Sequence, residues 1–290
     1  MEIRQACVDT QSAFAYCERI TREHYENFPV ASLFIPANRR PFVSSIYAFA
    51  RAADDFADEG IVAPFERLRR IDEWESKLER CFEGKADHPV FIALAETIAK
   101  TGIPREPLSA LLKAFRLDVT KRSFGDFTEL LEYCENSANP VGQLVLHIFG
   151  EAKNTTILLS NSICTGLQLA NFWQDVTADL GKGRVYIPLE DFDRFGYTKS
   201  DLGRKVLDDR FRELMRFQVE RTRTYFSTGE PIVREVGRRL RFELSLTLRG
   251  GTAILDKIQK AGYDVLTRRP KLTAFDKLTL FSTAVLRTSL

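Results

Sequence analysis

The chain has 290 residues, of which 44% are hydrophobic and 28% charged, a composition typical of a globular protein with a sizeable core. Lysine and arginine total 42 against 40 acidic residues, a net charge of +2; a nucleic-acid-binding protein would carry a dominant basic face, so we expect no nucleic-acid partner. The five cysteines are scattered and never form a CxxC pair, which excludes a disulfide framework and a typical zinc site and favours a cytoplasmic location.

The chain has a helical pattern from its beginning. The first twenty residues carry spread charges and no apolar core, so we expect no secretory signal there. Apolar residues then recur every three or four positions, for example along residues 211–226, whereas no stretch sustains the alternation of a strand. Glycine and proline interrupt the pattern at fairly even intervals. We predict an all-α fold in which residues 1–290 form a single domain, a helical bundle around a central cavity.

The first cluster of charged residues lies in the stretch YAFARAADDFADEG. Its polar residues follow one another at gaps of three and four, which places them on one helical face: Tyr47, Arg51, Asp54 and Asp58. The two aspartates lie about 6 Å apart along the helix axis. Such spacing is also common on solvated acidic faces, where Arg51 would simply be an ion-pair partner of Asp54 or Asp55. This motif alone leaves both interpretations open.

The second cluster ends the longest charge-free run of the chain. This run, 154–174, is long enough to suggest a membrane span, but about half of its residues are polar or glycine, so we expect a buried helix of a soluble protein. Polar residues again share one face: Gln168, Asn171, Asp175 and Asp179. The two amides could be satisfied core groups. The recurrence of carboxylates on a second helix favours a site that faces a cavity.

The chemistry of these residues favours magnesium. Buried like charges need cations, and carboxylate oxygens suit Mg²⁺, which also takes ligands from substrate phosphates. Two such helices facing each other would hold a diphosphate through several Mg²⁺ ions. A di-iron site would need Glu-x-x-His pairs, which His24, His88 and His147 do not form. The nearest approach to a dinucleotide-binding motif is GKGR, without a preceding strand, so we expect no NAD(P)H.

The two motifs and their flanks resemble the squalene/phytoene synthase family. The first motif is preceded by IYAFARAADD, and the second opens as QLANFWQD and closes as GRVYIP. The likeness extends from YCERITREHYENF near the N-terminus to AGYDVLTRR near the C-terminus. It implies the isoprenoid-synthase fold and reactions of isoprenoid diphosphates, in which Mg²⁺ bridges the carboxylates and the leaving group.

The resemblance also implies roles for individual residues. It assigns the metal ions to Asp54, Asp58, Asp175 and Asp179, which are catalytic together with a cavity tyrosine, Tyr133. Contacts with the substrate and its diphosphate fall on the remaining candidates: His24, Tyr47, Arg51, Gln168, Asn171, Tyr186 and Arg268. This chain departs from the family at Gln174, which replaces an arginine that often helps to hold diphosphate.

Three segments, ENFPVAS, SANPVGQLVLHIFG and NFWQDV, are similar to the hydroxysqualene synthase branch of bacterial hopanoid biosynthesis. That branch ionises presqualene diphosphate and lets water capture the cation, without a hydride donor. One alternative is condensation of two farnesyl or geranylgeranyl diphosphates to presqualene diphosphate, squalene or phytoene. Another is a non-catalytic assembly factor, which should have lost carboxylates that this chain keeps. Functional coupling to other squalene-pathway enzymes and peripheral contact with the inner face of the cell membrane stay open.

Overall fold

The computed structural model describes residues 9–23, 35–276 and 279. All regular elements in these ranges are helices, apart from one isolated bridge between Ser123 and Val185, so the all-α prediction is confirmed. The chain divides into two compact units, Met1–Thr120 with Leu144–Ala152, and Lys121–Gln143 with Lys153–Leu290. The single domain and its central cavity stay predictions.

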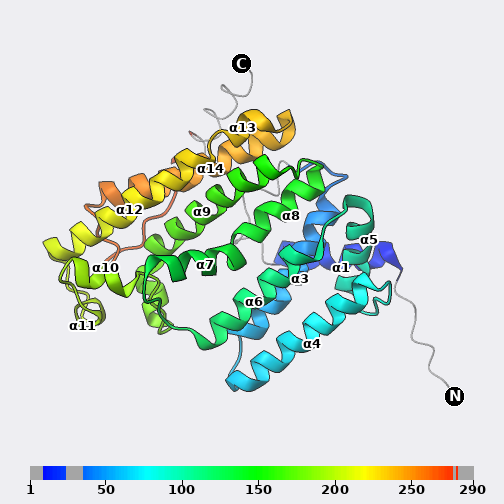
Figure 1. The fold of residues 1–290 in the computed structure, drawn as a ribbon, viewed down its shortest axis with the longest axis horizontal. Coiled ribbons are helices and arrows are strands. Elements are labelled where there is room, and N and C mark those ends of the chain that lie inside the picture. Colours follow the sequence, from blue (N-terminus) through cyan, green and yellow to red (C-terminus); the bar gives the residue numbers. More distant parts are fainter. Residues whose placement is uncertain (1–8, 24–34, 277–278, 280–290) are drawn as a thin grey trace. The chain divides into compact units, whose positions relative to one another are not determined.

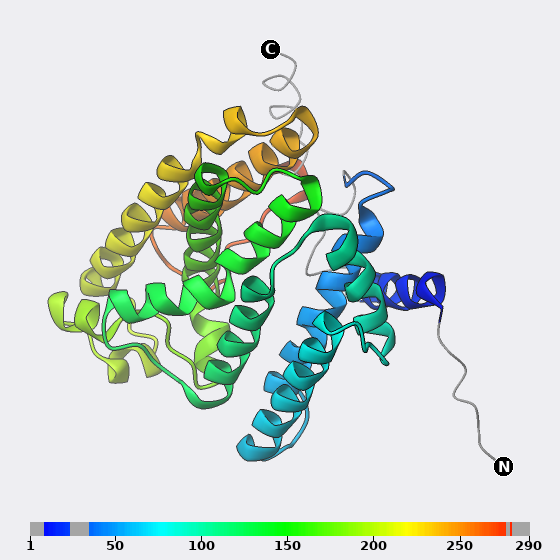
Figure 2. The same cartoon turned by 45° about the vertical axis from the view of Figure 1, so that its right-hand side comes forward.

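The first unit is built around one helix, α3 (Arg40–Asp58), which packs against four others: α1 (Thr10–Glu23), α4 (Pro64–Phe82), α5 (Pro89–Thr101) and α6 (Arg105–Thr120). Figure 2 shows α3 and α4, blue to cyan, running side by side. Phe49 of α3 is fully buried, stacks on Trp74 of α4 at 6.2 Å and meets Phe91 of α5 edge-on at 5.9 Å. Packing on several sides therefore fixes the helix that carries the first carboxylate motif.

The second unit has α9 (Asn154–Gly181) at its centre. This helix contacts α7 (Phe127–Ser137), α12 (Asp209–Gly229), α13 (Ile232–Glu235) and α14 (Arg238–Lys260). Figure 1 shows α12 and α14 running beside α9. Two short helices, α10 (Leu189–Arg194) and α11 (Lys199–Gly203), precede α12, and α8 (Asn139–Phe149) contains residues of both units.

Burial of α9 confirms the interpretation of the charge-free run. Ten of its residues are buried, from Thr156 to Val176. The indole of Trp173, fully buried, donates a hydrogen bond of 2.7 Å to the hydroxyl of Thr222 on α12. Thr165 donates to the side chain of Asn139 on α8, so polar groups of the run also bond to neighbouring helices. Within the described ranges, no helix is both long enough and apolar enough to cross a bilayer.

Glycines allow α9, α12 and α14 to approach closely around the ring of Phe226. A Cβ atom added to Gly166 of α9 would lie 3.0 Å from that ring. One added to Gly251 of α14 would lie 2.5 Å from it and 2.9 Å from the side chain of Leu167. Because the Phe226 ring is 5% exposed, it has little room to move.

This contact predicts opposite effects for two adjacent glycines. Gly251→Ala forces a methyl group into Phe226 and should lower the free energy of unfolding by about 1–3 kcal/mol. Gly250→Ala meets nothing within 4 Å and should raise it by roughly 0.5–1 kcal/mol, because alanine favours the helix. Urea unfolding followed by circular dichroism measures both. Equal changes in the two variants would contradict the packing argument.

Candidate active site

The second carboxylate motif occupies the last two turns of α9. The amide of Asn171 donates a hydrogen bond of 3.0 Å to Asp175, whose side chain is 16% exposed. Burial, together with the negative charge of Asp175, raises the pKa of Asp179 to about 6. The predicted stripe thus exists as a helical face, and burial together with the charge of Asp175 disfavours ionisation of Asp179. Such a pair is a ready site for cations.

An arginine distant in sequence supplies positive charge to this motif. Arg269 pairs with Asp175 through two nitrogens, Nε to Oδ1 and Nη2 to Oδ2, the second at 2.9 Å. This hydrogen bonding to Asp175 raises the pKa of Arg269, and the charges of Asp175 and Asp179 add to the effect. Arg268, the residue that the resemblance favours, is exposed and makes no hydrogen bond or ion pair with a described residue. Its role stays a prediction, and Arg269 is a site residue that the motif analysis missed.

The segment that carries Arg269 is tied to α9 by its backbone. The hydroxyl of Thr177 donates to the carbonyl oxygens of Val265 and Leu266, at 3.0 and 3.2 Å. The side-chain amide of Gln174 donates to the carbonyl oxygen of Pro270. Gln174 stands where the family often has a diphosphate-binding arginine, and in this chain it holds the residue next to Arg269.

Four aromatic side chains gather beside the motif. Tyr186 stacks on Phe172 of α9 with ring centroids 3.8 Å apart and planes within 8°. Tyr133 of α7, only 6% exposed, lies 6.0 Å from Tyr186 and 6.2 Å from Phe172, and Phe124 lies against both tyrosines. The structure therefore brings together the two predicted tyrosines. Their ring faces can stabilise a carbocation.

Backbone pairing between two loops positions Tyr186. The amide of Val185 donates to the carbonyl of Arg122 at 2.9 Å, and those of Leu189 and Glu190 donate to the carbonyls of Phe124 and Gly125, each at 3.0 Å. A small cavity beside Tyr186 is lined by both parts of the site, the stripe and the aromatic cluster: Phe172, Val176, Asp179, Arg184, Val185, Tyr186, Ile187 and Leu202. The segment after α9 therefore joins the carboxylates to the aromatic rings.

The first motif lies at the C-terminal end of α3. Arg51 pairs along its own helix with Asp54 at 3.4 Å, Asp55 at 2.5 Å and Glu59 at 2.6 Å. The pairs with Asp54 and Asp55 are those of the alternative interpretation, and the role of Arg51 toward diphosphate stays a prediction. Asp58 is exposed at the last position of the helix. No basic residue occupies the last turn, so these acids oppose the helix dipole as well as one another.

The remaining predicted residues are placed as follows. Tyr47 is partly buried on α3, about three turns before Asp58, and Gln168 is partly buried on α9, about one turn before Asn171. His24 lies outside the described residues. The two motifs lie in different units, so their joint action is a proposal.

The donor set fits Mg²⁺. Asp175 and Asp179 offer carboxylate oxygens on one helical face, with the Asn171 amide beside them. Among the described residues, no group of three or more histidine, cysteine or acidic side chains forms a ready-made metal cage. Mg²⁺ binds through one or two carboxylates, keeps several waters and shares substrate phosphates, so it does not need such a cage.

Comparison with known proteins identifies the class. Residues 21–276 match the squalene/phytoene synthase family. A squalene synthase HpnC from Alicyclobacillus acidocaldarius has a structure that superposes with a TM-score of 0.84, at 40% identity, over 88% of this chain and 95% of that one. A dehydrosqualene synthase structure, 23% identical, shares the fold with a TM-score of 0.87 over 97% of this chain and 98% of its own.

Two curated relatives carry different names. A hydroxysqualene synthase from Sinorhizobium fredii is 33% identical over 255 residues, 87% of this chain and 85% of the relative. A phytoene synthase from Arthrospira platensis is 30% identical over 288 residues, 95% of this chain and 93% of the relative. The chain belongs to the squalene/phytoene synthase family, whose members are enzymes that act on isoprenoid diphosphates.

A buried carboxylate outside both motifs went unnoticed in the sequence. Glu243 of α14 is 7% exposed, and neither of its carboxylate oxygens has a hydrogen-bond partner in the described structure. Burial raises its pKa to about 7 from an ordinary value of 4.5. A charged Glu243 therefore opposes folding, whereas a protonated one does not.

Glu243 predicts a pH-dependent stability. Folding raises the pKa of Glu243, so this residue costs no stability below pH 4.5. Its cost grows, and the free energy of unfolding falls, as the pH rises from there through about 7. Glu243→Gln should raise the free energy of unfolding at pH 8 by roughly 1–3 kcal/mol, and the gain should vanish towards pH 4. Urea unfolding at several pH values tests this, with Glu235→Gln, at an exposed position, as control. A gain that is independent of pH would refute the titration of Glu243.

Proposed function

We propose that the protein is a hydroxysqualene synthase, which converts presqualene diphosphate and water to hydroxysqualene and diphosphate. The chief support is the relative named hydroxysqualene synthase, which is 33% identical over 87% of this chain. The 40% identical HpnC structure, named a squalene synthase, supports the same family. Gln174 adds support, because one cationic contact that would help to bind a second diphosphate is replaced by a hydrogen bond to Pro270.

The reaction begins with departure of the diphosphate. The bond between the substrate carbon and the diphosphate oxygen breaks, and both electrons leave with the oxygen. Mg²⁺, when bound, neutralises the charge that develops on the diphosphate. Asp175 and Asp179 would hold it on α9, Asp54 and Asp58 on α3. Arg269 exchanges Asp175 for a diphosphate oxygen and adds fixed positive charge.

The cation that remains must be protected until water reaches it. Tyr133, Phe172 and Tyr186 present aromatic faces, each worth about 0.5–2 kcal/mol to a nearby cation. After rearrangement, the oxygen of a water molecule bonds to the cationic carbon and loses a proton, which completes the alcohol. No electron donor is required, so the reaction is balanced in atoms and electrons without a nicotinamide.

Condensation of two isoprenoid diphosphates is the second candidate. It is favoured by the phytoene synthase relatives, which are about 30% identical over nearly the whole chain. In that reaction a diphosphate leaves one substrate, the double bond of the other attacks the resulting cation, and the new cation loses a proton. Both reactions need the same carboxylates, so product analysis rather than mutagenesis separates them.

A product assay with Mg²⁺ and without nicotinamide decides between these functions. Presqualene diphosphate and farnesyl diphosphate are offered separately, and geranylgeranyl diphosphate in a third reaction. We expect hydroxysqualene from the first substrate alone. Presqualene diphosphate, squalene or phytoene formed from the other substrates would establish the condensing reaction. No turnover of any substrate by folded protein would favour a non-catalytic assembly factor.

The α9 carboxylates predict a large loss of turnover on neutralisation. Asp175→Asn and Asp179→Asn each remove an anionic ligand and should lower kcat/KM by about 10²–10³-fold or more. Asp193→Asn, at an exposed position of α10, is the matched control and should leave it unchanged. Steady-state release of diphosphate provides the measurement. Near-normal rates in both α9 variants would remove the basis for the assigned metal site.

Replacement of Arg269 should change metal binding and turnover in opposite directions. Arg269→Gln frees Asp175 and should strengthen Mn²⁺ binding without diphosphate by roughly fivefold, the worth of a partly exposed ion pair. The same change should lower kcat by about tenfold or more, because a diphosphate contact is lost. Titration calorimetry and turnover provide the two readouts. Arg268→Gln is the comparison, and a stronger effect on metal binding there would contradict the pairing of Arg269 with Asp175.

A further inference from the structure

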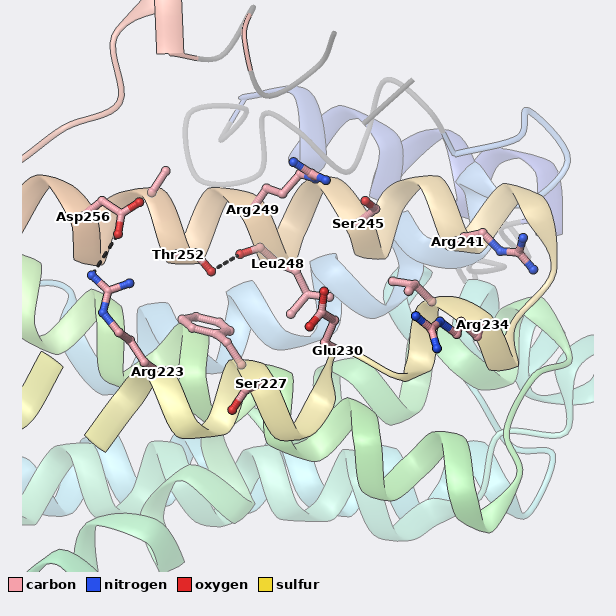
Figure 3. Close-up of a pocket in the computed structure, with 13 residues that line it drawn as sticks. Arg223, Ser227, Glu230, Arg234, Arg241, Ser245, Leu248, Arg249, Thr252 and Asp256 are labelled. Atoms are coloured by element: carbon pink, nitrogen blue, oxygen red, sulfur yellow. Dashed lines mark hydrogen bonds and ion pairs between the residues drawn. The ribbon is translucent and has the colours of Figure 1, made fainter. Parts of the chain in front are cut away.

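A groove between α12 and α14, in the second unit, shares no residue with the carboxylate site. Its volume is about 690 Å³. Side chains of α12, α13 and α14 line it, as Figure 3 shows. Apolar atoms form part of its lining, from Phe226, Val233, Leu248 and Ala253. The groove therefore combines an apolar lining with charged side chains.

The charges of the groove do not cancel. Arg223 is neutralised, since it donates to Asp256 at 2.8 Å and to Gln259 at 2.9 Å. Three further arginines and one acid line the groove, and none of them forms an ion pair with a described residue: Arg234, Arg241, Arg249 and Glu230. Three positive charges against one negative charge leave the groove with an excess of two.

Two of these arginines lie at the same end of the groove. Figure 3 shows Arg234 and Arg241 where α13 leads into α14. Arg241 donates from Nη2 to the carbonyl of Val236 at 3.3 Å, while its Nε is buried and lacks an acceptor in the described structure. Arg234 and Arg241 together carry two positive charges that no described acid neutralises, so this end favours a ligand with anionic oxygens.

Phosphate esters match this pattern, because a guanidinium presents paired donors to phosphate oxygens. The apolar lining adds a preference for a ligand that continues into hydrocarbon, which a free phosphate lacks. The nearly balanced charge of the whole chain, +2, disfavours a long polyanion. We infer that the groove binds the head group of an anionic phospholipid and so docks the enzyme on a membrane surface. This inference goes beyond the proposed reaction.

Vesicle co-sedimentation tests the inference without any substrate. Wild-type protein is mixed with phosphatidylcholine vesicles that contain or lack phosphatidylglycerol. We expect binding to the anionic vesicles. The double variant Arg234→Gln/Arg241→Gln should lose roughly twenty- to thirtyfold in partition coefficient, since each arginine near an anionic surface contributes about fivefold. The control Lys113→Gln/Lys260→Gln removes two exposed positive charges outside the groove and should bind like wild type.

Several outcomes would overturn the inference: equal binding of wild type to both kinds of vesicle, an equal loss in the lysine control, or full binding by the arginine variant. Soluble glycerol phosphate and inorganic phosphate form a further arm, measured by calorimetry. Binding of either that needs Arg234 and Arg241, without binding to vesicles, would identify a small phosphate ligand instead of a lipid. Circular dichroism confirms folding of each variant, and turnover in detergent, measured separately, keeps this result distinct from the proposed reaction.

Discussion

Mutual repulsion between Asp175 and Asp179 is the constraint around which the second unit is arranged. The two carboxylates lie one turn apart on the central helix of that unit, where burial weakens the screening of their charges by water. Several neighbouring residues either supply positive charge or fix the group that does. Arg269 supplies it, and Thr177 and Gln174 fix the segment that carries Arg269.

Such a site needs a rigid support, and the packing of α9 provides it. The indole of Trp173 donates a hydrogen bond to Thr222 of α12. Phe172, the residue before Trp173, stacks on Tyr186. Two adjacent residues of α9 thus pack in different places: Phe172 in the aromatic cluster and Trp173 in the core. Displacement of α9 against α12 would disturb both the carboxylates and the rings.

Patterns within single helices were predictable from the sequence. The all-α class, the burial of the charge-free run, the polar stripe of α9 and the ion pairs of Arg51 all follow from helical spacing, and the structure has them. Partners far apart in the chain were not predictable in this way. Arg269 lies 94 residues from Asp175, and no periodicity reports on a contact between a loop and a distant helix. Glu243 differs, because it lies three residues after Leu240 and three before Leu246, so helical spacing does place this carboxylate on the buried face.

The pairing of Arg269 with Asp175 has a consequence for the order of events in the proposed reaction. A lone metal ion must compete with a resident guanidinium, whereas a metal ion that arrives with diphosphate brings a new partner for that guanidinium. Metal and diphosphate would then raise each other's affinity by the same factor, as thermodynamic linkage requires. The enzyme would thus respond to the complex of the two as one ligand, and would tolerate fluctuations in free metal concentration between turnovers.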